Sequence, residues 1–222
     1  KDIKDLKCQV QSQDSDFGVK SFCEYKGLLF LLSGVGTRGS NHEDFIEKVL
    51  SKHKQKSWKI CAWHKNQRTM QVGNKPNEVG WQPYKICNKY GAIIATGHEH
   101  SYARTKTLTK MGDENQNHGA SGLPELVELG DNKNFVFVNG VGGHSIRPYN
   151  KIFGALPEWW ASIYTSDYTI KNRKTLQKGA NINKDYGVLF VTFNYLGQKT
   201  KAKAQFITAK GKILDEFMIE KK

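Results

Sequence analysis

The chain has 222 residues, and its composition is 38% hydrophobic, 11% aromatic and 25% charged. This length fits one large domain or two small ones, and the aromatic content excludes an intrinsically disordered chain. The longest apolar run, residues 27–35, is far too short to cross a bilayer. We therefore expect a soluble globular protein without a membrane span, or a piece of one, from which any signal segment has been removed.

The charge is strongly positive. The formal net charge is +13, from 34 basic and 21 acidic residues, and only five of the basic residues are Arg. Recognition of bases and of phosphate groups favours Arg, whereas a Lys-rich surface produces a diffuse positive field. No nucleic-acid-binding module is recognisable, so nucleic acid is not an expected partner. The charge is compatible with an anionic substrate without demonstrating one.

The four cysteines have no CxxC or CxxxC spacing, which excludes a zinc ribbon. Cys61 lies in an apolar run and is expected in the core. Cys8 and Cys23 flank a polar segment and could form a disulfide in an oxidising compartment.

In the first half of the chain, apolar runs alternate with an amphipathic segment. The first twenty residues are polar and predict irregular structure. Ser40 and Asn41 are suitable N-caps for a helix in which Phe45, Ile46, Val49 and Leu50 form one apolar stripe. Alternating strands and helices predict parallel pairing in a layered α/β sheet. The expected strands are residues 28–35 (buried on both faces), 58–63 and 92–96, and the expected helices are 42–53 and 83–90.

The second half has a different character. Residues 111–122 are polar and rich in Gly and Asn, which predicts a surface loop, and Trp159 and Trp160 are expected in an irregular insertion or in ordinary core. The segment 210–212 (Lys-Gly-Lys) predicts a hairpin. The expected strands are 135–139, which leads into a glycine turn at 140–143, and the antiparallel strands 188–193, 201–208 and 213–219.

The most informative segment is residues 92–105, AIIATGHEHSYART. In an extended backbone, residues two apart project to the same side about 6.5–7 Å from each other, so His98 and His100 face one way and Glu99 the other. Two metal ions in a hydrolytic pair lie about 3.5–4 Å apart, so each imidazole could reach a different ion.

A third histidine follows another buried strand, in the run WKICAWH ending at His64. Active groups in open α/β sheets collect beyond the carboxyl ends of the strands. His64, His98 and His100 are therefore expected at one edge of the sheet, where neutral imidazoles suit zinc, iron and related ions.

These motifs resemble those of the calcineurin-like metallophosphoesterases, and within them the purple-acid-phosphatase-like branch. GHEHSYART is the most specific part, and segments 17–35, 135–144 (FVFVNGVGGH) and 186–219 are similar to that family's strand pair, glycine turn and closing hairpins. The resemblance implies a single domain over 1–222, the C-terminal portion of a layered β-sandwich flanked by helices and incomplete at its N-terminal side.

The resemblance also implies roles for individual residues. His64 and His98 would bind one metal ion and His100 a second, the ions being Fe, Zn or Mn. Asn66 and Arg68 would face a phosphorylated substrate, and His144 would serve as an acid in hydrolysis by an activated water. Tyr102 and Arg104 would orient the ligating histidines.

The sequence departs from the family in lacking its earlier motifs, which supply the bridging carboxylate and half of the metal ligands. Residues 39–44 (GSNHED) superficially resemble one of them, but Asn41 and His42 are better explained by helix capping. Buried ions need compensating charge, and three neutral histidines do not supply it. We therefore expect an N-terminal portion outside this chain to complete the site, and a separate chain could supply it.

Two rival interpretations remain open. Residues 33–39 contain GxGxxG between a strand and a helix, as in an NAD-binding fold, but the third Gly precedes the helix and no acidic residue follows the next strand. Alternatively, the chain is an inactive structural or binding subunit that uses its lysines and Trp159–Trp160 as contacts. Glu99, Asp113 and Glu114 lie near the site and could replace the missing metal ligands, but they are expected to be solvated loop acids. The family resemblance implies an extracellular or periplasmic location.

Overall fold

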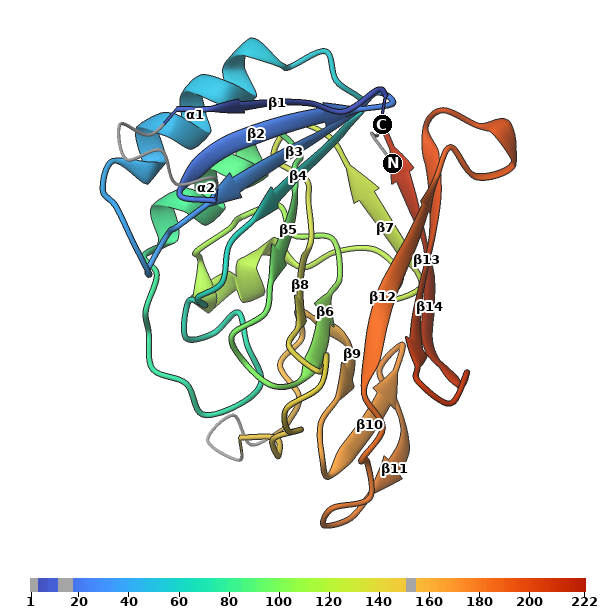
Figure 1. Cartoon of the computed structure of the whole chain (residues 1–222). Coiled ribbons are helices and arrows are strands. Elements are labelled where there is room, and N and C mark those ends of the chain that lie inside the picture. Colours follow the sequence, from blue (N-terminus) through green and yellow to red (C-terminus); the bar gives the residue numbers. More distant parts are fainter. Residues whose placement is uncertain (1–3, 12–17, 151–154) are drawn as a thin grey trace.

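The computed structural model describes residues 4–11, 18–150 and 155–222. It has a mixed α/β architecture dominated by two sheets, one of ten strands and one of four (Figure 1). Two α-helices cover one face of the larger sheet, and the smaller sheet packs against its other face. Within the described part of the chain, neither helix has the length and apolar content that crossing a membrane requires.

The larger sheet has the order β1-β2-β3-β4-β5-β8-β6-β9-β10-β11, and the smaller sheet has the order β12-β13-β14-β7. The strands of the larger sheet are β1 (Lys7–Val10), β2 (Lys20–Tyr25), β3 (Leu28–Ser33), β4 (Trp58–Ala62), β5 (Ile93–Thr96), β6 (Tyr102–Thr105), β8 (Val136–Asn139), β9 (Trp160–Tyr164), β10 (Tyr168–Lys171) and β11 (Lys174–Lys178). Those of the smaller sheet are β7 (Leu126–Leu129), β12 (Gly187–Phe193), β13 (Lys201–Thr208) and β14 (Ile213–Lys221). The helices are α1 (His42–Lys52), α2 (Trp81–Lys89) and the short 3-10 turns η1 (Glu114–Gly119) and η3 (Tyr195–Gly197).

The centre of the larger sheet is parallel, as the alternation of strands and helices predicts. β3 pairs with β4, β4 with β5, and β5 with β8, all in parallel, and α1 and α2 form the crossovers between the first three. The carboxyl ends of these strands therefore lie at one edge of the sheet. Strand β3 differs from the prediction in one respect, because its burial alternates: Leu29 and Leu31 are fully buried against the helices, while Leu28 and Phe30 are half-exposed on the other face.

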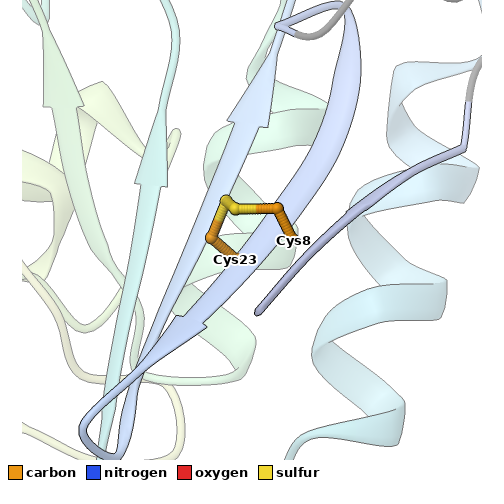
Figure 2. Close-up of a disulfide and its surroundings, with 2 residues drawn as sticks. All are labelled: Cys8 and Cys23. Carbon is orange, nitrogen blue, oxygen red and sulfur yellow. A yellow bond between two sulfur atoms is a disulfide. The ribbon is translucent and has the colours of Figure 1, made fainter. Parts of the chain in front are cut away.

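The N-terminal segment is more ordered than its polar composition predicts. Residues 7–10 form β1, which pairs antiparallel with β2, although all four of its side chains are exposed. Cys8 lies directly opposite Cys23, and the two form a disulfide across the strand pair (Figure 2). The disulfide holds a strand that has little apolar surface of its own. Residues 12–17 lie outside the described residues.

Helix α1 buries the predicted stripe of Phe45, Ile46, Val49 and Leu50. Its start differs from the capping prediction. Asn41 occupies the N-cap position in a left-handed conformation, with φ of 55°, and its side chain makes no capping hydrogen bond. The His42 ring lies 3.0 Å from Ser33 Oγ and 2.8 Å from the Arg38 carbonyl. His42 therefore fastens the glycine turn between β3 and the helix.

In the second half, β12, β13 and β14 form the predicted antiparallel strands, with a turn at Lys210–Lys212. Two expectations are decided by the structure. Trp160 lies in strand β9 rather than in an irregular insertion, and it is fully buried, as the alternative of ordinary core predicted; β9 pairs between β6 and β10 in the larger sheet. The polar segment 111–122 contains η1 and the fully buried His118, so part of it packs into the protein.

Candidate functional site

The first histidine pair lies where β4 and β5 end. His64 follows β4 by two residues, and its carbonyl accepts hydrogen bonds from the backbone N–H groups of Gly97 and His98 (3.3 and 3.0 Å). These bonds bring the two strand ends together. As a result, His64 Nε2 lies 2.8 Å from His98 Nδ1.

His100 and His144 form a second pair of histidines. The ring centroids of His100 and His144 are 5.3 Å apart, and the hydroxyl of Ser145 lies 2.8 Å from His100 Nδ1 and 3.1 Å from His144 Nδ1. The backbone N–H of Arg147 donates to the His100 carbonyl at 2.9 Å, which holds the glycine-rich loop after β8 against this turn. His144 is exposed, whereas His100 is half-buried.

Burial favours the neutral form of His98 and of His100. Burial lowers the pKa of His98 to about 4, with Lys75 and Lys65 acting in the same direction and Glu78 opposing them. Burial and then the charge of Arg147 also lower the pKa of His100. Neutral imidazole is the form that binds a metal ion or accepts a proton.

Glu78 is a site residue that the sequence did not indicate. Its Oε2 lies 3.0 Å from His98 Nε2, and its other oxygen pairs with Lys65. Burial would raise the pKa of Glu78, but the hydrogen bond from Lys65 and the charges around it outweigh this effect and lower the pKa. The residue lies in irregular backbone before α2, where no periodicity marks it.

Glu99 is not the solvated loop acid that we expected. Its side chain is fully buried, and neither carboxylate oxygen has a hydrogen-bond partner among the described residues. The nearest cationic atom is Arg147 Nη1, 3.6 Å from Oε2, and burial raises the Glu99 pKa. Gly73 packs directly on this carboxylate, so any Cβ there would overlap it. Asp113 instead accepts a hydrogen bond from Gln116 N in η1, and Glu114 Oε1 lies 3.4 Å from the Thr69 hydroxyl.

Asn66 and Arg68 were expected to face the substrate. Asn66 has no exposed surface: its amide donates to the Thr96 hydroxyl (2.6 Å) and its carbonyl oxygen accepts from Glu99 N (3.3 Å). Asn66 thus positions the turn that carries the histidines. Arg68 Nη1 donates to the Gly73 carbonyl at 3.3 Å. The positive charge of Lys75, by contrast, contributes to lowering the pKa of both His98 and His100.

The expected support of the histidines by Tyr102 and Arg104 is also corrected. The Tyr102 hydroxyl and Arg104 Nε both donate to Asp215 Oδ2, each at 2.7 Å. All three side chains are buried between the two sheets. Tyr102 and Arg104, on β6, therefore point into the core between the two sheets and connect the sheets. Ser145 lies beside His100 instead.

The geometry of the His64–His98 pair can be compared with that of two histidines that bind one metal ion. Two imidazole nitrogens that bind one tetrahedral ion at ~2.1 Å are separated by about 3.4 Å, whereas the 2.8 Å between His64 Nε2 and His98 Nδ1 is a hydrogen-bond distance. Among residues 4–11, 18–150 and 155–222, no three His, Cys, Asp or Glu side chains are placed to share an ion. Imidazole nitrogens are suitable donors for zinc, iron and related ions.

The glycines of the rival GxGxxG motif form a tight turn between β3 and α1. A Cβ at residue 36 would approach the Glu78 carbonyl at 2.7 Å, and Gly36 and Gly39 have φ of 73° and 84°. The N–H groups of Thr37 and Arg38 donate to the Gly34 carbonyl, at 2.8 and 2.9 Å. The glycines are thus required by backbone conformation and close packing, and these N–H groups are already bonded within the turn.

Neither a protein-family model nor a curated protein sequence matches this chain. Among solved structures, a purple acid phosphatase isolated from yellow lupin (Lupinus luteus) seeds is similar, with a TM-score of 0.65 and 17% sequence identity. The similarity covers 90% of this chain and 32% of the lupin chain. The chain therefore has a purple-acid-phosphatase-like fold and spans about a third of the length of that protein.

Proposed function

We propose that this chain provides the histidine part of a metal-dependent phosphoric ester hydrolase of the metallophosphoesterase type. The observation that supports the proposal is the presence of two histidine pairs, His64 with His98 and His100 with His144, in the loops that follow the parallel strands. The proximity of His64 and His98 and the lowered pKa values of His98 and His100 also support it, because neutral paired imidazoles are suited to metal ligation.

In this proposal His64 and His98 hold one ion and His100 holds a second, the ions being Fe, Zn or Mn. When bound, such a pair polarises the phosphoryl oxygens and acidifies water. The compensating carboxylates come from polypeptide outside the described residues, because two multivalent ions beside neutral imidazoles would otherwise leave charge uncompensated. Asn66 keeps the His98–His100 turn in place, as its two hydrogen bonds to Thr96 and Glu99 indicate.

The substrate of this site is a phosphorylated compound. Lys75 and Arg147 contribute positive charge next to the histidines, which favours an anionic ligand. His144 is exposed beside His100, where it can donate a proton to a departing alkoxide. The Cys8–Cys23 disulfide supports an extracellular or periplasmic location.

Metal binding tests the proposal without relying on turnover. Titration of the purified chain with Zn²⁺ or Mn²⁺ in a calorimeter is expected to show binding that weakens by about tenfold or more in His98→Ala and His64→Ala. His53→Ala is the matched control, because His53 lies at the end of α1, with Nδ1 2.8 Å from the Val49 carbonyl. Equal metal affinity in all four proteins would refute the histidine site.

A further inference from the structure

Strand β12 forms one edge of the smaller sheet. Within the described residues it pairs only with β13, so its other edge carries backbone N–H and C=O groups that no strand uses. Its outward side chains Val188 and Phe190 are 44% and 56% exposed. Its inward side chains are also only half-buried, although they lie opposite the fully buried residues of β13; these are Leu189, Val191 and Phe193.

The part of the larger sheet that faces β12 is also incompletely covered. Leu28 and Phe30 of β3 are half-buried, and they pack against the same apolar cluster as the inward side of β12. Trp58 connects the two rows, because it lies opposite Leu28 in the larger sheet and its ring centroid is 5.0 Å from that of Phe193. One side of the core between the sheets is therefore incompletely covered, from β12 across to β3.

We propose that this open side, formed by β12 and the half-buried face of β3, is the docking surface for a separate, acidic polypeptide that adds a strand beside β12. Backbone pairing along β12 would satisfy its free edge, and alternate apolar side chains of the added strand would cover Leu28, Phe30 and the inward row of β12. The sequence that fits the surface alternates apolar residues with Asp or Glu.

Charge distinguishes this occupant from a second copy of the chain. Each copy carries a formal net charge of +13, so two copies repel one another, whereas an acidic strand is attracted. Lys201 and Lys203 of β13, beside the outward face of β12, pair with Glu220 and Glu216 at 3.4 and 3.1 Å, so the attraction of an acidic strand comes from the net charge of the chain. A second copy paired through β12 would moreover leave the acidic ligands of the histidine site unsupplied.

The position of β12 links docking to the histidines, a step that rests on the proposed function. The strand begins at the histidine edge, where Gly187 N donates to the Val141 carbonyl (3.0 Å) and the Tyr186 hydroxyl to the His144 carbonyl (3.1 Å). A strand added along β12 therefore ends at the edge where the histidines lie. The similar lupin structure has the same fold within a much longer chain, since the match covers 32% of it.

Selection from a displayed library of random peptides as long as β12, which has 7 residues, tests the surface on the intact, metal-free chain. We expect enriched peptides to alternate apolar and acidic residues and to slow amide exchange in residues 187–193. Phe190→Glu should weaken their binding by about tenfold or more, because it places like charge beside the acidic side chains. Leu196→Glu is the matched control, since Leu196 is 78% exposed and lies in η3, outside the strand.

Three results would overturn the proposal: no peptide that separates wild type from Phe190→Glu, enrichment of basic peptides, or a dimer of the chain in sedimentation that Phe190→Glu dissociates. Repeating the peptide titrations on His98→Ala separates this inference from the proposed function. Peptide binding that survives in that variant shows that docking does not depend on the histidine site, and a wild-type chain that binds peptide but no metal would leave the docking surface standing and the hydrolase proposal refuted. Metal binding without peptide binding would refute the docking surface and leave the hydrolase proposal standing.

Discussion

Arg104 and Asp215 form a buried ion pair that joins the two sheets. Arg104 Nε on β6 donates to Asp215 Oδ2 on β14 at 2.7 Å, and the two residues are 0% and 1% exposed. Ser162 donates to the other oxygen of Asp215 at 2.8 Å, and the Arg104 guanidinium lies 3.9 Å from the centre of the Phe217 ring. Burial would raise the pKa of Asp215, but the Arg104 charge and these hydrogen bonds outweigh it and lower the pKa.

Removing one partner of this pair should be strongly destabilising. We expect Asp215→Ala to lower the free energy of unfolding by ~3–5 kcal/mol, because a buried guanidinium is left without its counter-charge. Glu216→Ala is the matched control on the same strand: Glu216 pairs with Lys203 at 3.1 Å near the surface, and its loss should cost at most ~1 kcal/mol. Urea denaturation measures both. Similar losses in the two variants would contradict the structural role of the pair.

Gly140 should be indispensable to the histidine turn. A Cβ at this position would overlap the carbonyl of Glu99 and come within 2.5 Å of the Gly97 carbonyl, and neither backbone atom can move without displacing His98 or His100. We expect Gly140→Ala to cost about 1–3 kcal/mol and to weaken metal binding. Gly142→Ala, in the same loop, meets no atom within 4 Å and should change neither. Chemical denaturation and calorimetry with Zn²⁺ compare the two variants.

His118 should make the protein less stable in mild acid. Its ring packs between Trp81 and Trp159, with centroid distances of 5.0 and 4.8 Å, and burial lowers its pKa from 6.5 to about 4. The unfolded state therefore binds the extra proton first. The stabilisation is complete above pH 6.5 and declines as the pH falls towards 4, by at most ~1.4 kcal/mol per pH unit.

His118→Asn should remove this contribution to the pH dependence. Asn lacks a titrating group and tolerates the φ of 55° at this position. We expect the unfolding free energy of the variant to fall less steeply than that of wild type between pH 6.5 and 4. The measurement is a series of denaturant titrations at several pH values. Parallel curves for the two proteins would show that His118 titrates normally.

Reduction of the Cys8–Cys23 disulfide should release β1 and leave the rest of the fold intact. All four side chains of β1 are exposed, and its pairing partner in the larger sheet is β2 alone. Hydrogen exchange after mild reduction is expected to show loss of protection in residues 7–10 and unchanged protection in β4 and β5. The cross-link should contribute at most ~3 kcal/mol to global stability. Unfolding of the parallel strands on reduction would contradict this expectation.

The sequence predicted the central elements well because each of them is encoded locally. The apolar runs of β4 and β5 and the stripe of α1 have clear periodicities, and a histidine directly follows each strand. Since parallel strands end at one edge, their order in the chain already places His64, His98 and His100 near one another. The polar strand β1 escaped prediction because a disulfide and backbone pairing, rather than apolar burial, hold it in place.

The roles of neighbouring polar residues depend on contacts between segments that are far apart in the chain. Tyr102 and Arg104 follow the histidines closely, yet they bind Asp215, which is more than a hundred positions away. Asn66 and Glu99 lie in polar surroundings in the sequence and are fully buried in the structure. No local pattern predicts such partners.

The sequence by itself therefore determined the α/β alternation, the paired hairpins of the second half and the strand-end histidines, because side-chain periodicity and chain order act over short distances. Only the tertiary structure decided which charges lie near those histidines, that Glu99 is buried with Arg147 as its nearest cation, and that among the described residues one side of the core is half-covered. Burial and ion pairing depend on the packing of whole layers, and a linear pattern does not contain that information.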